Sequence, residues 1–275
     1  MSIPILSVVT ISFNQASFLE RTIRSVLEQD YPAIEYIIVD PGSTDGSRDI
    51  IQKYKALFSR AILESDNGAA DGLNKGFANA TGDIFCYLNS DDEFLPGAFR
   101  RVVSEFENRP DADVLCGHAY IVDADGRRLR RVWSDPFNKR SQAHGMSVQI
   151  QPSTFIRRKA FQRSSGFNEK NKIAWDGELI ISLAKSGSKI EVFDDFLSLY
   201  RVHETSITGA GSYNDLRRAW NDRRFYLLMG RERRTLDKCM RVLFFLTRQL
   251  RNPRAFLERF LRGPVFRRAA GRKST

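Results

Sequence analysis

Short apolar runs alternate with amphipathic stretches through the first third of the chain. The runs are rich in Ile, Val and Tyr, and the stretches between them repeat apolar residues at helical spacing. The expected strands are Leu6–Ile11, Tyr36–Val39, Ala61–Leu63 and Ile84–Leu88. Strands that alternate with helices of this length form βαβ units. The sequence therefore predicts an α/β fold with a mostly parallel central sheet flanked by helices.

The first expected helix carries a sequence signal at its start. Ser17 and Glu20 have the spacing of a capping box, in which the two side chains satisfy backbone N–H groups of the first turn. Leu19, Ile23 and Val26 then recur on one helical face. Two further helices are expected after Gly46 and over residues 69–80.

The segment from residue 96 to residue 204 has a less regular pattern. Asp123–Gly126 is typical of a hairpin turn, and Ser153–Ile156 and Phe193–Val202 are expected strands. Asp176–Ser186 predicts a helix that is closed by Gly187. Residues 213–262 predict two or three helices studded with arginine.

Charge is distributed unevenly along the 275 residues. Residues 205–275 hold 18 Lys and Arg against 5 Asp and Glu, whereas residues 1–204 hold 25 against 28. This change indicates a boundary near residue 205. We therefore expect one domain over 1–204, with a first half over 1–95 and a second over 96–204. A basic helical C-terminal extension would follow over 205–275.

Cysteine usage and hydropathy bear on the compartment. Cys86, Cys116 and Cys239 are odd in number and lack metal-ligand spacing, which favours a reducing, cytoplasmic setting. The start of the chain does not have the pattern of a signal peptide. No apolar run reaches the ~18 residues that a membrane-spanning helix needs.

Polar side chains gather where three of the expected parallel strands end. Ser12-Phe13-Asn14, Asp40 and Asn89-Ser90-Asp91-Asp92 each follow an apolar run. In an open parallel sheet, ligands bind outside the carboxyl ends of the strands, so these groups would converge on one crevice. Adjacent carboxylates suit a hard divalent cation whose coordination shell is completed by substrate phosphates. A solvated turn rich in Asp and Ser is the structural alternative.

Five segments together resemble family-2 inverting glycosyltransferases with a GT-A fold. They occur in the family's order and with similar spacing: Val9–Asn14, Ile38–Gly46, Asp66–Phe77, Thr81–Asp92 and Trp175–Leu179. The resemblance covers about residues 5–204. It implies a Rossmann-like GT-A domain whose first half, residues 1–95, binds a nucleotide sugar and whose second half, residues 96–204, binds the acceptor.

The resemblance also implies roles for individual residues. Asp92 would hold Mg²⁺ or Mn²⁺, Asp91 would face the ribose or share the ion, and His203 is a further candidate ligand. The candidate donor-binding residues are Ser12, Phe13, Asn14, Asp40, Asp71, Lys75, Asn89 and Asp91.

Several of these residues also have a structural interpretation. Phe13 could be a core residue, and Asp40 a turn-forming residue. Asp71 and Lys75, four residues apart, could be an ordinary surface ion pair on a helix, and His203 could be structural. Many relatives have Arg where this chain has Leu73, and Pro41 replaces a frequent Asp.

Inversion needs a base that deprotonates the acceptor hydroxyl. Asp176 matches the family's base position, and Glu178 is the alternative. Because Asp176 begins an expected helix, it could instead be an N-cap.

These observations predict a metal-dependent inverting glycosyltransferase that moves one sugar from a nucleotide-diphosphate sugar to a saccharide or lipid-linked saccharide. The resemblance suggests assembly of a bacterial surface polysaccharide or glycolipid. An anionic membrane surface is a candidate partner of residues 213–262, on the inner face of the cell membrane. No nucleic-acid partner is expected, because no recognisable module accompanies the basic charge. The alternatives are a sugar nucleotidyltransferase and a non-enzymatic binding module whose basic tail binds membrane or nucleic acid.

Overall fold

A computed structural model describes residues 3–204 and 214–263, so both ends of the predicted extension, residues 205–213 and 264–275, lie outside the described residues. Nine strands of the described chain form one sheet in the order β3-β2-β1-β4-β8-β6-β9-β5, with β7 paired to β6. The strands are β1 Leu6–Ile11, β2 Ile34–Val39, β3 Arg60–Ile62, β4 Ile84–Asn89, β5 Glu93–Phe94, β6 Val114–Val122, β7 Arg128–Val132, β8 Thr154–Arg157 and β9 Ile190–Arg201.

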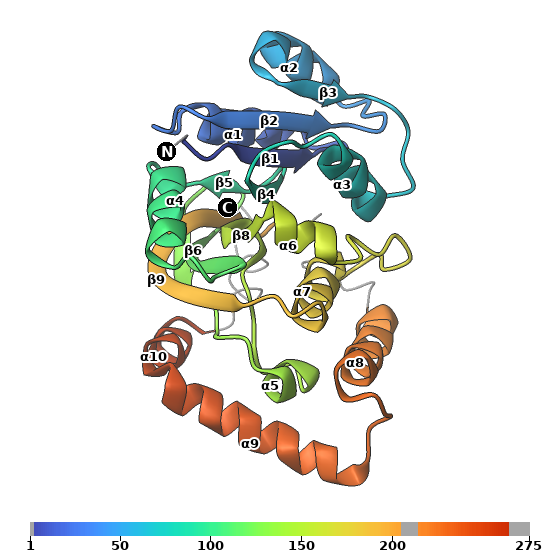
Figure 1. The fold of residues 1–275 in the computed structure, drawn as a ribbon, viewed down its shortest axis with the longest axis vertical. Coiled ribbons are helices and arrows are strands. Elements are labelled where there is room, and N and C mark those ends of the chain that lie inside the picture. The colour runs from blue at the N-terminus through green and yellow to red at the C-terminus, as the bar shows by residue number, and fades with distance from the viewer. Residues whose placement is uncertain (1–2, 205–213, 264–275) are drawn as a thin grey trace, which may run out of the picture.

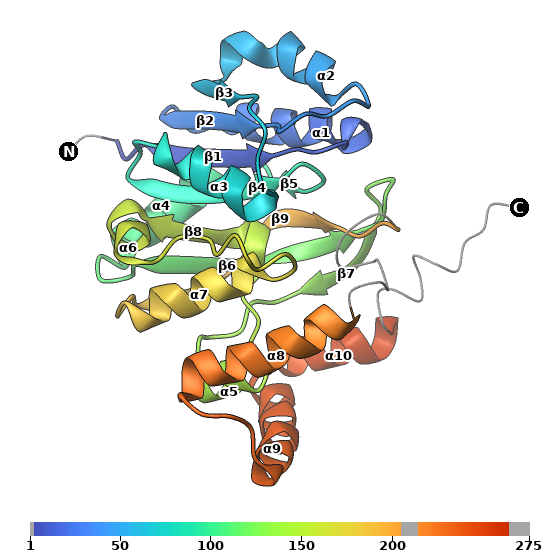
Figure 2. The same cartoon turned by 90° about the vertical axis from the view of Figure 1, so that its right-hand side faces the viewer.

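Helices cover both faces of this sheet, and the last three lie at one end of the molecule (Figures 1 and 2). The α-helices are α1 Ala16–Leu27, α2 Ser47–Tyr54, α3 Ala69–Ala78, α4 Ala98–Asn108, α5 Lys139–Ala143, α6 Arg158–Arg163, α7 Trp175–Lys185, α8 Asn214–Met229, α9 Thr235–Arg251 and α10 Pro253–Arg262. Two 3₁₀ turns, η1 Lys55–Leu57 and η2 Gln151–Ser153, complete the elements. The predicted α/β class is confirmed.

The N-terminal half of the sheet is parallel, which brings its strand ends together. β1 pairs in parallel with both β2 and β4, and Ile11 lies opposite Val39 on one side and Asn89 on the other. The segments that follow these three residues therefore leave the sheet at the same edge. Beyond β4 the pairing is mixed, because β8 is antiparallel to β4 and to β6, while β6 and β9 are parallel.

Alternate residues of the central strands belong to two different hydrophobic cores, one on each face of the sheet. Leu6 and Val8 of β1 belong to the cluster formed with α1 and α4, whereas Val9 belongs to the cluster formed with α3 and α7. Both sets are fully buried, as expected for a parallel strand that is covered on both faces. Each such side chain stabilises the fold by about 1.5–3 kcal/mol relative to exposure.

The predicted capping box of the first helix is wrong. α1 begins at Ala16, so Ser17 lies inside the first turn, and no side chain caps the helix from the N-cap position. Instead, the backbone N–H of Ala16 donates to Asp45 Oδ2 at 2.8 Å and that of Gln15 donates to Ser47 Oγ at 3.2 Å. The loop after β2 therefore caps α1, and the sequence spacing alone could not reveal this distant partner.

The C-terminal extension packs against the rest of the chain. Phe225 and Leu228 of α8 are buried with Ala143 of α5 and Ile181 of α7. Glu258 of α10 accepts a hydrogen bond from the backbone N–H of Arg131 in β7 at 2.9 Å. Three helices match the expected two or three, while the boundary near residue 205 stays a prediction. None of the described helices is both long and apolar enough to cross a bilayer.

Candidate active site

A cavity of about 670 Å³ opens at the carboxyl ends of β1 and β4. Its wall combines the loop after β1, the loop before α3, the turn after β4, the start of α7 and the end of β9. The lining residues are Ile11, Ser12, Phe13, Gln15, Pro41, Asp66, Gly68, Ala69, Asn89, Ser90, Asp91, Asp92, Gln151, Ile173, Trp175, Asp176, Tyr200 and Arg201. Six predicted site residues are therefore brought together: Ser12, Phe13, Asn89, Asp91, Asp92 and Asp176.

Three buried oxygens on this wall have no hydrogen-bond partner among the described residues. They are Ser12 Oγ, Asn89 Oδ1 and Asp92 Oδ2. The Asn89 side chain is oriented by its amide nitrogen, which donates to Gln151 Oε1 at 3.1 Å. Because buried polar atoms are rarely left without a partner, three of them on one cavity indicate that a ligand completes their hydrogen bonding or coordination.

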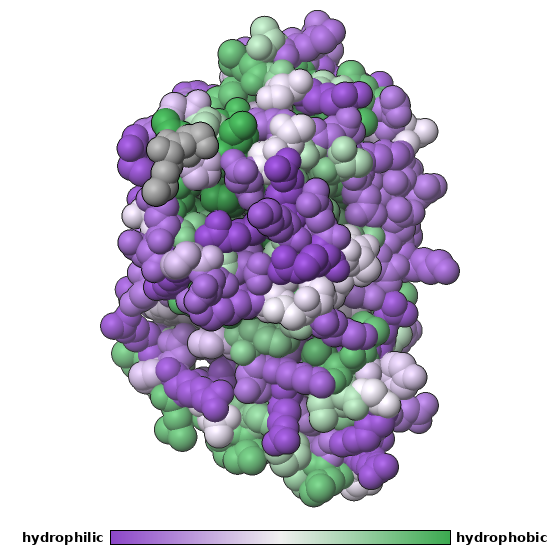
Figure 3. Space-filling model, in the orientation of Figure 1, coloured by the Kyte–Doolittle hydropathy of each residue, from purple (hydrophilic) through white to green (hydrophobic). Residues whose placement is uncertain are grey.

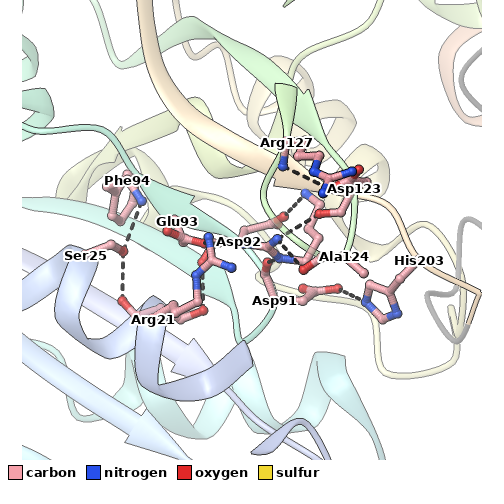
Figure 4. Close-up of polar contacts among 12 residues, drawn as sticks. Arg21, Ser25, Asp91, Asp92, Glu93, Phe94, Asp123, Ala124, Arg127 and His203 are labelled. Carbon is pink, nitrogen blue, oxygen red and sulfur yellow. Dashed lines mark hydrogen bonds and ion pairs between the residues drawn. The ribbon is translucent and has the colours of Figure 1, made fainter. Parts of the chain in front are cut away.

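Asp91 is the carboxylate that faces a second candidate metal ligand. Its Oδ2 lies 3.0 Å from His203 Nε2, and the His203 ring packs on Phe18 with the ring centroids 4.7 Å apart. Figure 4 shows the two side chains facing one another below the loop that carries Asp123 and Ala124. The resemblance implied that His203 is a candidate metal ligand, and the structure places its ring beside the carboxylate of Asp91.

Asp92 is turned into the protein. Its side chain is 1% exposed, and its Oδ1 accepts a hydrogen bond from the backbone N–H of Arg201 at 2.8 Å. Burial raises the pKa of Asp92 well above its usual range, and the neighbouring Asp91 raises it further. Its Oδ2 is the oxygen that has no partner among the described residues.

The three predicted metal ligands therefore do not form one compact set. Within residues 3–204 and 214–263, no group of three or more His, Cys, Asp and Glu side chains is arranged to hold an ion. Mg²⁺ is commonly held by only one or two carboxylates together with substrate phosphates. Asp91 with His203, beside the unpartnered oxygens of Asn89 and Asp92, fits that kind of site.

Arg201 is a site residue that the sequence did not single out. Its guanidinium is fully buried, forms an ion pair with Glu93 and donates to the backbone oxygen of Asp91 at 2.8 Å. It also donates to the carbonyl oxygens of Asp123 and Ala124 at 2.8 and 3.0 Å. Arg201 thus fixes the turn that presents Asp91. The available signal was an arginine ending an apolar strand two residues before His203.

The two candidate bases have different surroundings. Asp176 lies in the first turn of α7 on the cavity wall, and burial raises the pKa of its carboxyl. The N-cap is Ala174, so the capping interpretation of Asp176 is wrong.

Glu178 points away from this wall into a network of donors. Its carboxylate accepts from Asn168, Asn171 and Arg223, with the shortest contact at 2.7 Å to Asn171 Nδ2. Burial alone would raise the pKa of Glu178, but these partners, Arg223 foremost, lower it below its usual range. Glu178 therefore joins α7 to α8, and of the two candidate bases only Asp176 lines the cavity.

The remaining predicted donor residues form the frame behind the cavity. The Asp40 carboxylate accepts from Gly42 N, from Ser43 N and Oγ, and from Arg48 Nε at 2.6–3.2 Å. Burial alone would raise its pKa, but these donors hold it below the usual range. Asn14 Oδ1 accepts from Thr44 N at 2.9 Å, which links the loops after β1 and β2. The structure thus gives Asp40 the turn-forming role.

Asp71 and Lys75 also act on a loop. They form an ion pair at 3.3 Å, while Asp71 accepts from Asn67 N and Lys75 donates to the Ser65 carbonyl. Together they hold the segment that places Asp66 and Gly68 on the cavity wall. Phe13, by contrast, is 59% exposed at the rim and is not a core residue.

Two glycines of α3 are explained by packing. A Cβ on Gly72 would lie 2.7 Å from Asp66 Oδ2, and one on Gly76 would overlap Val9 of β1. Glycine destabilises a helix relative to alanine, but at these two positions any larger residue would collide with neighbouring atoms of the chain. Neither needs a ligand to explain it.

Comparison with solved structures defines the class of fold. The mannosyltransferase PcManGT from Pyrobaculum calidifontis, solved with GDP-Man and Mn²⁺, matches with a TM-score of 0.65 and 17% identity. The match covers 100% of this chain and 77% of that chain. S. aureus TarS 1–349, solved with UDP-GlcNAc, matches with a TM-score of 0.64 and 18% identity. That match covers 96% of this chain and 77% of that chain. The chain thus has the fold of GT-A glycosyltransferases.

The family follows from the sequence comparison. Residues 7–164 match the family model described as Glycosyl transferase family 2. The chain belongs to this family.

Individual relatives cover different shares of the chain. An uncharacterized glycosyltransferase of Mycobacterium tuberculosis, Rv1514c, is 30% identical over 84% of this chain and 88% of its own length. The putative teichuronic acid biosynthesis glycosyltransferase TuaG of Bacillus subtilis is 44% identical over 46% of this chain and 51% of its own length. An uncharacterized glycosyltransferase of Nostoc, alr2836, is 29% identical over 72% of this chain, and the match spans 65% of that relative.

Proposed function

We propose that the chain transfers one sugar from a nucleotide-diphosphate sugar to an acceptor hydroxyl, with inversion at the transferred carbon. The observation that carries the proposal is the cavity at the ends of β1 and β4. It combines three unpartnered buried oxygens, the Asp91–His203 pair and a carboxyl of raised pKa on Asp176. Family membership and the donors bound by PcManGT and TarS support the same reading.

The donor would lie along the β1 and β4 side of the cavity. Phe13 at the rim can stack on a nucleobase, an interaction that any base allows. Ser12 and Asn89 supply the polar atoms that the buried wall leaves unpartnered. We therefore assign Ser12, Phe13 and Asn89 to donor binding, and Asp40, Asn14, Asp71 and Lys75 to holding the loops that surround it.

Mg²⁺ or Mn²⁺ would be held by Asp91, with His203 as the neighbouring ligand, while Asp92 supports the turn from behind. A divalent ion at this place neutralises charge on the diphosphate and so improves the leaving group. The sequence suggested Asp92 as the main metal ligand, and we assign that role to Asp91 instead. It rests on Asp92 being buried against Arg201 N and on Asp91 facing His203.

Asp176 is the proposed base for the acceptor hydroxyl. Asp176 lines the same cavity as the ends of β1 and β4, so the acceptor would lie between α7 and the donor. A pKa raised by burial brings the carboxyl closer to the working pH, which favours proton transfer from a hydroxyl. Trp175, beside it on the wall, would contact the acceptor.

The acceptor we propose is a saccharide or a lipid-linked saccharide of a bacterial surface polymer. The relative TuaG is described as a teichuronic acid biosynthesis enzyme, which supports that setting. Peripheral attachment to an anionic membrane through α9 and α10 would suit a lipid-linked acceptor.

A panel of nucleotide sugars tests the transfer proposal. We expect at least one of them to raise the Tm, and to be hydrolysed slowly, only when Mn²⁺ or Mg²⁺ is present. Asp176→Asn should keep the Tm shift and lose transfer. Failure of every donor to bind, with and without metal, would exclude the proposal.

A further inference from the structure

A second cavity lies in the C-terminal part of the molecule, apart from the proposed active site. It has a volume of about 880 Å³ and is formed by the end of α5, the start of α9 and the segment between α8 and α9. Its lining residues are His144, Met146, Asp222, Arg233, Arg234, Thr235, Asp237, Lys238, Arg241, Val242 and Phe245. None of them lines the first cavity.

Cations outnumber available acids on this wall. Asp237 is already held by Arg231, whose two terminal nitrogens contact its two oxygens at 2.8 and 2.9 Å. Asp222 is 72% exposed and lies 3.4 Å from Arg233. Among the described residues, Arg234, Lys238 and Arg241 form no ion pair with a carboxylate. At the start of α9, Asp237 Oδ2 also accepts from the backbone N–H of Arg234 at 2.7 Å, so this acid already caps the helix N-terminus.

Arg224 of α8 adds a charge directly behind this wall. Its Nη2 donates to Asn221 Oδ1 at 2.8 Å, but its buried Nε has no partner among the described residues. Burial, together with the nearby Arg233 and Arg241, lowers the pKa of Arg224 to about 10. A Cβ on Gly145 would collide with the same guanidinium, so the chain packs tightly around it. Arg224 is partly buried, and no described carboxylate forms an ion pair with it, so a bound anion would stabilise its charge.

One side of the cavity is apolar and continues onto the surface. Val242 and Phe245 line the cavity and are 59% and 43% exposed, and Leu246, one turn from Val242, is 53% exposed. Figure 3 shows hydrophobic residues at the lower end of the molecule, where Figure 1 places α9. The two acids of α9 and α10, Asp237 and Glu258, are both buried. The surface beside the cavity therefore combines apolar side chains with positive charge.

We propose that this cavity binds a phosphate group, and that the apolar wall beside it receives the hydrocarbon part of a phosphate-bearing lipid. Arginine and lysine side chains are groups that recognise phosphate. The site depends on no step of sugar transfer, and it gives the membrane attachment proposed above for α9 and α10 a specific phosphate ligand. Soluble phosphate and a lipid headgroup share this chemistry, and the experiment separates them.

The test uses the full chain in EDTA, so that phosphate does not bind at a metal-dependent diphosphate site. Inorganic phosphate is titrated by calorimetry, and flotation is measured with vesicles of phosphatidylcholine alone and with added phosphatidic acid. The test variant is Lys238→Ala with Arg241→Ala. The matched control is Arg251→Ala, which removes an exposed cation of the same helix outside the cavity.

We expect the double variant to lose at least about tenfold in affinity for phosphate and for the acidic vesicles, because it removes two charge-assisted contacts. Arg251→Ala should change the phosphate affinity little. Binding of phosphate without vesicle binding would support the cavity with a soluble ligand, and vesicle binding alone would support the lipid. Absence of both, or equal binding by the double variant and wild type, would overturn the proposal.

A second variant keeps the test clear if the double variant is unstable. Arg224→Met removes the partly buried charge while leaving most of the side-chain volume. If a bound anion stabilises the charge of Arg224, Arg224→Met should raise the Tm in the absence of phosphate. The variant should also lose the additional Tm increase that phosphate gives the wild type. A lower Tm with an unchanged response to phosphate would contradict the role of Arg224.

Discussion

At the ends of β1 and β4 the groups left without a partner are oxygens, whereas between α8 and α9 they belong to arginines. Among the described residues, Ser12, Asn89 and Asp92 each have a buried oxygen without a partner. Arg224 and Arg233, in the same described part of the chain, each have a buried Nε without a partner, and the pKa of Arg224 is lowered. The first region therefore suits a cation with its phosphates, and the second suits an anion.

The largest expected effect is a loss of kcat, and it should differ between the two carboxylates of α7, Asp176 and Glu178. Asp176→Asn should lower kcat by about 10²–10⁴-fold, the usual contribution of a general base, and leave donor affinity unchanged. Steady-state kinetics and donor titration measure the two quantities.

Glu178→Gln is the control for that variant. It should lower the Tm, because it weakens the contact between α7 and Arg223 of α8, but kcat should fall much less. A larger loss of kcat in Glu178→Gln than in Asp176→Asn would transfer the role of base to Glu178.

The next effect concerns the frame of the active-site cavity. Arg201→Met should lower the free energy of unfolding by about 3–5 kcal/mol, because it leaves Glu93 without its buried partner. Urea denaturation measures this change. Arg21 also contacts Glu93, at 3.0 Å, but its side chain is 44% exposed, so Arg21→Met should cost less than about 1 kcal/mol. Equal losses in the two variants would show that Arg201 is not the central support.

A pH profile sharpens the assignment of Asp176. The base acts when ionised, and burial raises its pKa, so kcat/KM should fall with decreasing pH at a value above that of an exposed aspartate, about 3.9. Thermal unfolding over the same pH range separates this loss from acid denaturation. An acid limb at or below the ordinary value would contradict the assignment of Asp176 as the base.

A truncation tests whether the two regions work separately. Removing residues 231–275 deletes α9 and α10 but keeps α8, whose Arg223 contacts Glu178 and whose Phe225 is buried. We expect metal-dependent donor hydrolysis to persist and phosphate binding in EDTA to disappear. Loss of donor hydrolysis in a truncated chain that remains folded would show that the regions are coupled.

The parallel half of the fold could be predicted because its signals are local. The run Leu6–Ile11 is β1 as expected, and its polar continuation, with that of β4, reaches the same edge. The pairing of β9 with β6 and β5 depends on contacts between distant segments, so the sequence could not place Arg201 beside Asp91. The role of Asp92 also depended on a distant partner, Arg201. The turn-forming role of Asp40 was one of the two interpretations that the sequence allowed, because its partners Ser43 and Arg48 are close in sequence.

The most direct measurement compares Asp91→Asn with Asp92→Asn in calorimetric titrations of UDP and GDP, with and without Mn²⁺. Wild type should bind at least one of the two nucleotides more tightly with Mn²⁺. Asp91→Asn should lose that gain, by at least about tenfold in affinity if a ligand to the ion is removed. Asp92→Asn should retain most of it, because an amide can still accept from Arg201 N. Metal-dependent binding that survives in Asp91→Asn, or that is lost only in Asp92→Asn, would contradict the assignment of Asp91.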